Sequence, residues 1–213
     1  MDKKTILFLG DSITQGACAS RNENRYVDLV GEKLGATVIN YGLGGTRIAR
    51  QEEIHESHTF NYDFNLRAEI MQSKADYVVV FGGVNDYLHG SAPLGNEQDE
   101  TCYTFYGAVK NLLKKLITKY DKNKIIVVLP LNTSDGNTVK IKHGEKVTLS
   151  SYQNIIYTVA KKYGLNVLDL TDCDELNPLL EESNIKCFAD GLHPNDAGHR
   201  ALAQAVCDFI NKL

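Results

Sequence analysis

Short apolar runs recur along the chain, and each one ends in glycine or polar residues. Continuous apolar runs of this length, bounded by turn residues, are typical of strands that are buried on both faces of a parallel sheet. The pattern therefore predicts strands at residues 5–9, 37–41, 77–81, 124–129 and 166–170.

Amphipathic segments with helical spacing separate these runs. They predict helices at residues 25–34, 66–72, 103–120, 150–163 and 196–211. Ser150 and Gln153 form a capping-box pattern at the start of the fourth helix, and Gly164 is expected just past its end. Because strands alternate with helices, we expect an α/β fold in which helices cover both faces of a mostly parallel, five-stranded sheet.

The composition is that of an ordinary globular protein. Hydrophobic residues make up 43% and charged residues 23% of the 213 residues, which argues against a disordered chain. No repeat, low-complexity tract or linker divides the sequence, so we expect a single domain over residues 1–213. The net charge of -4 leaves no basic surplus for a phosphate backbone, which disfavours nucleic-acid binding.

The chain shows no segment for membrane insertion or export. The first apolar run is too short for a signal-peptide core or a membrane span. The five cysteines are scattered, without a C-x-x-C pair, so neither a zinc site nor a disulfide framework is predicted. We therefore expect a cytoplasmic protein with no membrane partner, and its oligomeric state stays open.

Small and polar residues follow the first three predicted strands, at residues 10–16, 42–47 and 82–86. In a parallel sheet the loops beyond the carboxyl ends of the strands bind ligands. Ser12, just past the first strand, is a candidate nucleophile, although a turn or N-cap role fits the same position. A serine hydroxyl is inert at neutral pH without a base, so a histidine must lie close to it.

Three pairs in this sequence have the spacing Asp-x-x-His: Asp86/His89, Asp190/His193 and Asp196/His199. His193 precedes Pro194, which favours an extended loop in which both side chains are free to converge. In the first pair, in the loop after the third strand, Asp86 can instead serve local backbone hydrogen bonds. The third pair opens the last helix, where an aspartate simply complements the helix dipole. We therefore expect His193 to be the base and Asp190 to orient it.

Donors for an oxyanion are available at the same strand ends. Ser12 offers its own N–H, Gly44 and Gly45 allow close backbone approach, and Asn85 offers a side-chain amide. A tight turn and an Asx-turn are the structural alternatives for the glycines and for Asn85. Phosphate-binding fingerprints, the G-x-S-x-G elbow and histidine-carboxylate metal spacings are missing, so no cofactor or metal is expected.

Taken together, four segments resemble the blocks of the SGNH hydrolase family, the GDSL-type esterases. They are Gly-Asp-Ser, Asn-x-x-x-x-Gly, Gly-x-Asn-Asp and Asp-x-x-His-Pro, which lie in family order at residues 10–12, 40–45, 83–86 and 190–194. The resemblance implies a flavodoxin-like three-layer α/β/α sandwich and a serine esterase that needs no cofactor.

The resemblance also implies residue roles. Ser12 would attack the ester as the nucleophile, His193 would take its proton, and Asp190 would hold the imidazole. Ser12 and Gly45 would stabilise the oxyanion through their N–H groups, and Asn85 through its amide. Among their neighbours, we expect Asp11, Arg47 and Asp86 to contact the substrate.

The substrate is expected to be a small ester. The loops at residues 89–101 and 131–147 are polar and are candidates for a pocket rim or a lid. Because neither offers an apolar groove, we favour short acyl groups, mainly acetyl, on a polar alcohol such as a carbohydrate. The alternatives are a lysophospholipase or thioesterase for longer acyl chains, and a non-catalytic flavodoxin-like module that binds a small anion.

Overall fold

The computed structural model describes residues 3–52 and 61–213. Within these residues a five-stranded parallel sheet has the order β2-β1-β3-β4-β7. Its strands are β1 (Thr5–Gly10), β2 (Thr37–Gly42), β3 (Tyr77–Phe81), β4 (Ile125–Val128) and β7 (Asn166–Leu168). The predicted strands are therefore confirmed, with ends that differ by at most two residues.

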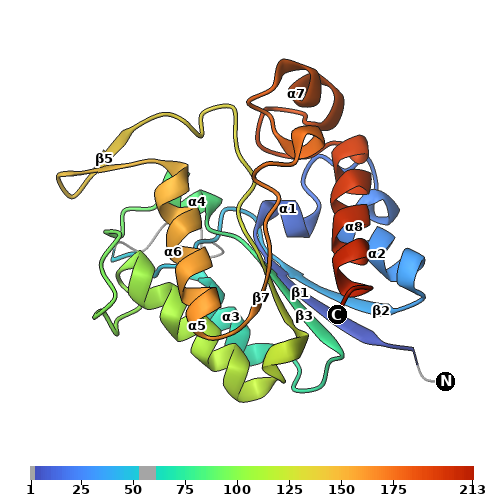
Figure 1. Ribbon diagram of the computed structural model, residues 1–213, viewed down its shortest axis with the longest axis horizontal. Coiled ribbons are helices and arrows are strands. Elements are labelled where there is room, and N and C mark those ends of the chain that lie inside the picture. Colours follow the sequence, from blue (N-terminus) through green and yellow to red (C-terminus); the bar gives the residue numbers. More distant parts are fainter. Residues whose placement is uncertain (1–2, 53–60) are drawn as a thin grey trace.

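Helices cover both faces of this sheet (Figure 1). On one face lie α3 (Phe64–Ile70), α5 (Phe105–Lys119) and α6 (Leu149–Lys162), and on the other lie α2 (Tyr26–Leu34) and α8 (Asp196–Ile210). Successive strand residues alternate between two cores, as the pleat requires. Leu7 and Leu9 pack in the first core, whereas Ile6 and Phe8 pack in the second. The predicted three-layer α/β/α fold is thus confirmed.

The starts of α6 and α3 differ from the prediction because the capping side chains lie elsewhere. The box of α6 is formed by Thr148 and Ser151, whereas Gln153 points inward and donates to the Pro130 carbonyl at 2.8 Å. Helix α3 begins at Phe64 because Asp63 caps it by accepting the Leu66 N–H. N-capping side chains fix the residue at which a helix begins more sharply than apolar periodicity can show.

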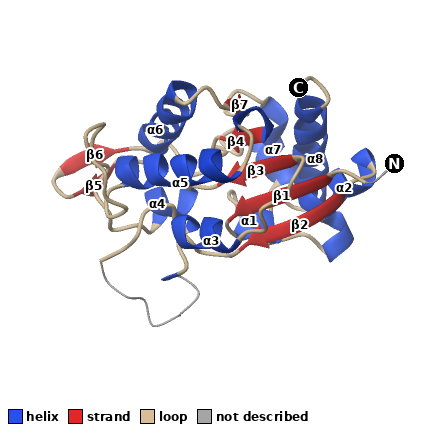
Figure 2. Cartoon of the chain, turned by 90° about the horizontal axis from the view of Figure 1, so that it is seen from below, coloured by secondary structure: helices blue, strands red, loops and turns tan. Residues whose placement is uncertain are grey.

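The loop predicted at residues 131–147 contains an antiparallel hairpin of β5 (Lys140–Lys142) and β6 (Glu145–Val147). It lies beside α4 (Val84–Leu88), as Figure 2 shows. Lys140 Nζ donates to the Leu88 carbonyl at 2.9 Å, and the carbonyls of Asp135 and Thr138 both lie within hydrogen-bond distance of the Tyr87 hydroxyl, which donates its one proton between them. The hairpin is therefore tied to the helix that carries Asn85.

Helix α1 (Ser12–Gln15) follows β1, and α7 (Glu181–Cys187) precedes the loop of Asp190 and His193. A membrane-spanning helix is not found in the part of the chain that the structure describes.

Candidate active site

Three side chains from opposite ends of the chain form one chain of hydrogen bonds. Ser12 Oγ lies 2.9 Å from His193 Nε2, and His193 Nδ1 lies 2.7 Å from Asp190 Oδ2. Because the carboxylate can only accept, Nδ1 carries the proton and Nε2 is left to accept from the serine hydroxyl. The structure therefore brings the expected nucleophile, base and orienting acid together.

The loop that carries the histidine is held by its own aspartate. Asp190 Oδ1 accepts the N–H groups of Leu192 and His193, at 3.0 and 2.7 Å. Partial burial opposes ionisation of Asp190, but the hydrogen bonds from His193 and the main chain outweigh it and lower the pKa of this carboxyl. Gly191 has φ of +77°, a conformation that glycine adopts without strain. Asp190 is therefore a charged, fixed partner for the imidazole.

The main chain around Ser12 supplies N–H donors. As the first residue of α1, Ser12 has an N–H without an intrahelical acceptor. The Gly44 N–H donates to Gln15 Oε1 at 2.8 Å, whereas among the described residues the Gly45 N–H meets no acceptor. A Cβ built on Gly44 would lie 3.6 Å from that of Ser12, so this loop runs beside Ser12. Of the two glycines, Gly45 has the free donor.

Asn85 lies on α4 and is only 5% exposed. Its Nδ2 donates to the Thr46 carbonyl at 3.1 Å, which connects α4 to the glycine loop. An amide nitrogen carries two protons, so one N–H remains for a ligand. Asn85 is thus hydrogen-bonded to Thr46, the residue that follows Gly45.

Asp86 binds the main chain of a neighbouring segment. Its carboxylate is buried, and its two oxygens accept the N–H groups of Ile48 and Ala49, both at 2.9 Å. Burial raises the pKa of Asp86 to about 7 despite these hydrogen bonds and the nearby Arg47 charge. Asp86 therefore anchors the segment after the glycine loop, which is the main-chain role that the sequence offered as the alternative to a substrate contact.

Asp11 also binds the main chain. It is 1% exposed and caps α1 by accepting the Ile13 N–H at 3.1 Å. Burial raises its pKa to about 6, and the Ile13 hydrogen bond and the Arg67 charge oppose that rise. Arg47, the third expected substrate contact, is half-buried and donates to the His89 carbonyl at 3.3 Å. Arg47 alone of these three keeps partly exposed surface.

Arg67 is a functional candidate that the sequence did not reveal. Its guanidinium is buried and donates to the carbonyls of Gly10 and Tyr41 and to Thr46 Oγ1. It thereby connects the ends of β1 and β2 to the glycine loop. Arg67 also donates to the carbonyl of Tyr62, so three of its acceptors are main-chain carbonyls. Every residue has a carbonyl, so the sequence does not show which ones bind an arginine.

His199 is buried and holds the turn that follows α1. Its Nδ1 accepts the Tyr26 N–H at 3.3 Å, and its Nε2 lies 3.2 Å from the Ala17 carbonyl, to which it donates. Its partner in the Asp-x-x-His pattern, Asp196, instead accepts the N–H and hydroxyl of Ser20. His199 thus holds the turn after α1, whereas Asp196 binds Ser20 at the surface in addition to the dipole role expected for it.

Stability is expected to fall in mild acid because of His199. Burial lowers the pKa of this imidazole, whereas the unfolded chain protonates near the ordinary value of about 6.5. As the pH falls, the unfolded state therefore binds the proton first. The contribution of neutral His199 to the free energy of unfolding is thus complete above about pH 6.5 and is lost as the pH falls below it. Urea unfolding at several pH values should show this loss in the wild type and a smaller loss in His199→Gln, which offers an acceptor and a donor but does not titrate. An equal pH dependence in both proteins would contradict this role.

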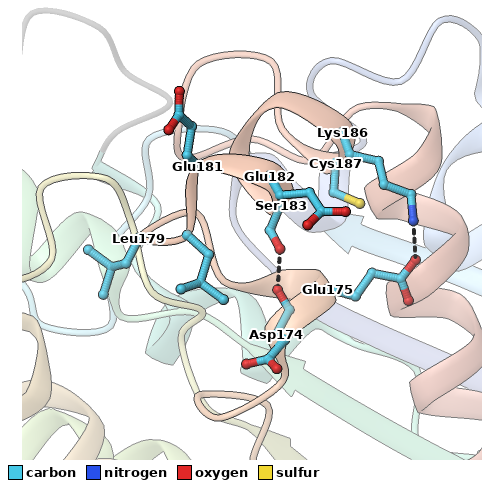
Figure 3. A pocket seen from close by; sticks show the side chains of 9 residues that line it. Asp174, Glu175, Leu179, Glu181, Glu182, Ser183, Lys186 and Cys187 are labelled. Atoms are coloured by element: carbon cyan, nitrogen blue, oxygen red, sulfur yellow. Dashed lines mark hydrogen bonds and ion pairs between the residues drawn. The ribbon is translucent and has the colours of Figure 1, made fainter.

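A cavity of about 700 Å³ lies between α7 and the turn before it (Figure 3). Its lining is largely acidic, and Glu175 pairs with Lys186 at 3.7 Å. Ser12, Asp190 and His193 do not line it. The cavity is therefore separate from the hydrogen-bonded chain of side chains.

One further side chain lies beside the Asp190–His193 pair. Cys18 Sγ and donor atoms of Asp190 and His193 all lie within 4.8 Å of one another. Among the described residues, this is the group that could hold a metal ion.

Comparison with known proteins agrees with this geometry. The sequence profile of the GDSL-like lipase/acylhydrolase family matches residues 8–201. A search of curated proteins found no significant match. Among solved structures, a protein from Lactobacillus plantarum is 28% identical with a TM-score of 0.82, and the alignment covers 100% of this chain and 98% of that one.

Two esterases of known structure are also similar. An acetyl xylan esterase is 25% identical with a TM-score of 0.67, over 96% of this chain and 98% of that one. A two-domain esterase active on acetylated mannans has the same fold, at 23% identity and a TM-score of 0.63, over 99% of this chain and 49% of that one. The chain belongs to the GDSL-like lipase/acylhydrolase family, as the sequence motifs predict, and is a carboxylic ester hydrolase.

Proposed function

We propose that this esterase hydrolyses short-chain acyl esters, chiefly acetyl esters, of a polar alcohol such as a carbohydrate. The observation that carries the mechanism is the hydrogen-bonded series from Ser12 through His193 to Asp190, with 2.9 and 2.7 Å between its polar atoms. Such a series activates a hydroxyl that is otherwise inert at neutral pH. We also propose that residues 1–213 form one domain, because both cores share one sheet.

The reaction proceeds in two acyl-transfer steps. Ser12 Oγ attacks the ester carbonyl while His193 Nε2 takes the hydroxyl proton, and the imidazolium then gives that proton to the departing alkoxide. A water molecule attacks the acyl-enzyme in the same manner and releases the acid and free Ser12. Asp190 holds the proton on Nδ1 throughout and stabilises the imidazolium.

Charge on the carbonyl oxygen is stabilised by the N–H groups of Ser12 and Gly45 and by the amide of Asn85. We expect Asn85→Ala to lower kcat by about 10²–10³-fold with little change in KM, because this donor acts on the transition state. Steady-state kinetics on p-nitrophenyl acetate measure both constants.

Asn166→Ala is the matched control for Asn85→Ala. Like Asn85, Asn166 donates from its side-chain amide to main-chain carbonyls, here those of Asn123 and Ile125, but it lies at the opposite end of the sheet. A similar fall in kcat for both variants would contradict the proposed oxyanion role of Asn85.

Two observations support a short acyl group on a polar alcohol. The side chains of His193 and Asp190 are 21% and 50% exposed, so the site is open rather than enclosed in a deep channel. The similar acetyl xylan esterase and the esterase active on acetylated mannans point to acetylated carbohydrates. Arg47 offers a donor to a hydroxyl or carboxylate of such a substrate.

Acyl preference is tested with p-nitrophenyl acetate, butyrate and octanoate, followed by acetylated xylan and mannan oligosaccharides. We expect kcat/KM to fall as the acyl chain lengthens, because a longer chain finds no added apolar contact at an open site. Acetate release from the oligosaccharides would support the carbohydrate substrate. Faster hydrolysis of the octanoate would overturn the short-acyl proposal in favour of lipid or thioester substrates.

A further inference from the structure

Three different metal-binding side chains meet at the edge of the proposed catalytic site. The thiol of Cys18, the carboxylate of Asp190 and the imidazole of His193 each place a donor atom within 4.8 Å of the other two. Thiolate, imidazole and carboxylate are the ligands that Zn²⁺ takes in proteins. The cluster lies at the surface, since Cys18 and Asp190 are exposed, so an ion can reach it from solvent.

Cys18 is held in place by hydrogen bonds on both sides. The Ala17 N–H donates to the Ser12 carbonyl at 2.9 Å, and the Ala17 carbonyl accepts from His199. On the other side, the Ala19 N–H donates to the Gly16 carbonyl at 3.1 Å. The opposite half of the cluster is equally fixed, because Asp190 binds the main chain of its own loop. The main chain that carries the donor atoms is therefore fixed before any ion arrives.

We propose that Cys18, Asp190 and His193 form an inhibitory site for a soft divalent cation such as Zn²⁺. The inhibitory consequence rests on the proposed function, because two of the ligands are the proposed base and its partner. Zinc bonds of about 2.0–2.3 Å in a tetrahedron require ligand atoms on the order of 3–4 Å apart, so small side-chain rotations close the site. Water completes the coordination.

Binding changes the protonation of both nitrogen and sulfur ligands without any oxidation. The Cys18 thiol releases its proton to solvent when sulfur binds the ion. The ligand nitrogen of His193 is Nδ1, which faces Asp190, and the proton on Nδ1 moves to Nε2. Nε2 then donates toward Ser12 Oγ and can no longer accept the serine proton. Zinc thus removes the base while the fold stays intact.

The ligand set also sets the selectivity. Mg²⁺ and Ca²⁺ bind oxygen ligands and gain little from a thiolate or an imidazole. We therefore expect Zn²⁺ and Cd²⁺ to inhibit at concentrations at which Mg²⁺ has no effect.

The test compares the wild type with Cys18→Ser in buffers of fixed free Zn²⁺. Both proteins should hydrolyse p-nitrophenyl acetate equally without the metal, because Cys18 takes no part in the proposed reaction. We expect the half-inhibitory Zn²⁺ concentration to rise at least about tenfold in Cys18→Ser. Cys173→Ser, a control at a partly exposed cysteine outside the cluster, should keep the sensitivity of the wild type.

A second readout does not depend on activity. Cd²⁺ added to Ser12→Ala should give an ultraviolet sulfur-to-cadmium charge-transfer band, and this band should be absent from the Ser12→Ala/Cys18→Ser double variant. A band without esterase activity in the wild type would refute the proposed function and leave the metal site standing. The absence of the band, or equal Zn²⁺ inhibition of wild type and Cys18→Ser, would overturn the metal site.

Discussion

Ser12→Ala is expected to lower kcat on p-nitrophenyl acetate by at least about 10⁴-fold, because alanine cannot form the acyl-enzyme. The variant should fold normally, since Ser12 Oγ contacts only His193 among the hydrogen bonds of the described residues. Main-chain N–H groups and Asn85 would still polarise the ester, so a small residual rate above that of water is expected. Steady-state kinetics with a circular dichroism spectrum of each protein measure both effects.

Ser20→Ala is the matched control for Ser12→Ala. Ser20 is an exposed serine eight residues further along, and its hydroxyl donates to Asp196 at 2.7 Å. We expect this variant to keep the wild-type kcat. Turnover by Ser12→Ala at a rate close to that of the wild type would contradict the nucleophile assignment.

Arg67→Met is expected to have the largest effect on stability, lowering the free energy of unfolding by about 3–5 kcal/mol. The substitution leaves the carbonyls of Gly10 and Tyr41 and the Thr46 hydroxyl without their buried donor. It also removes the positive charge that faces Asp11 in the interior. Urea denaturation measures the change.

The control for Arg67→Met is Arg25→Met, which removes a half-buried pair with Asp28. Because such partly exposed pairs contribute little, we expect a loss of at most about 1 kcal/mol. Arg67→Met should also lower kcat, since the segments carrying Ser12 and Gly45 lose their common anchor. Equal stability of the two variants would contradict the anchoring role of Arg67.

The sheet could be predicted because its strands are buried on both faces and therefore appear as unbroken apolar runs. Val78, Val79 and Val80 face alternate cores and are all buried. The hairpin of β5 and β6 escaped prediction because its strands are three residues long and mostly polar. Its position depends on lysine contacts with α4 carbonyls, which apolar periodicity does not report.

The side chains that meet at Ser12 could be anticipated because the carboxyl ends of parallel strands converge and because Pro194 favours an extended chain at His193. The direction of each polar side chain could not be read in this way. Asp86 and Asn85 are neighbours at the end of β3, yet Asp86 turns inward to main-chain N–H groups while Asn85 keeps a free N–H. Both residues are polar in the sequence, which does not show the direction of their side chains.

The most direct test of the central claim, that Ser12 is a nucleophile activated by His193, is covalent labelling with a fluorophosphonate followed by mass spectrometry. We expect one adduct per chain, located on the peptide that contains Ser12, no adduct in Ser12→Ala, and much slower labelling in His193→Ala. Labelling at another residue, or an unchanged labelling rate in His193→Ala, would contradict the account.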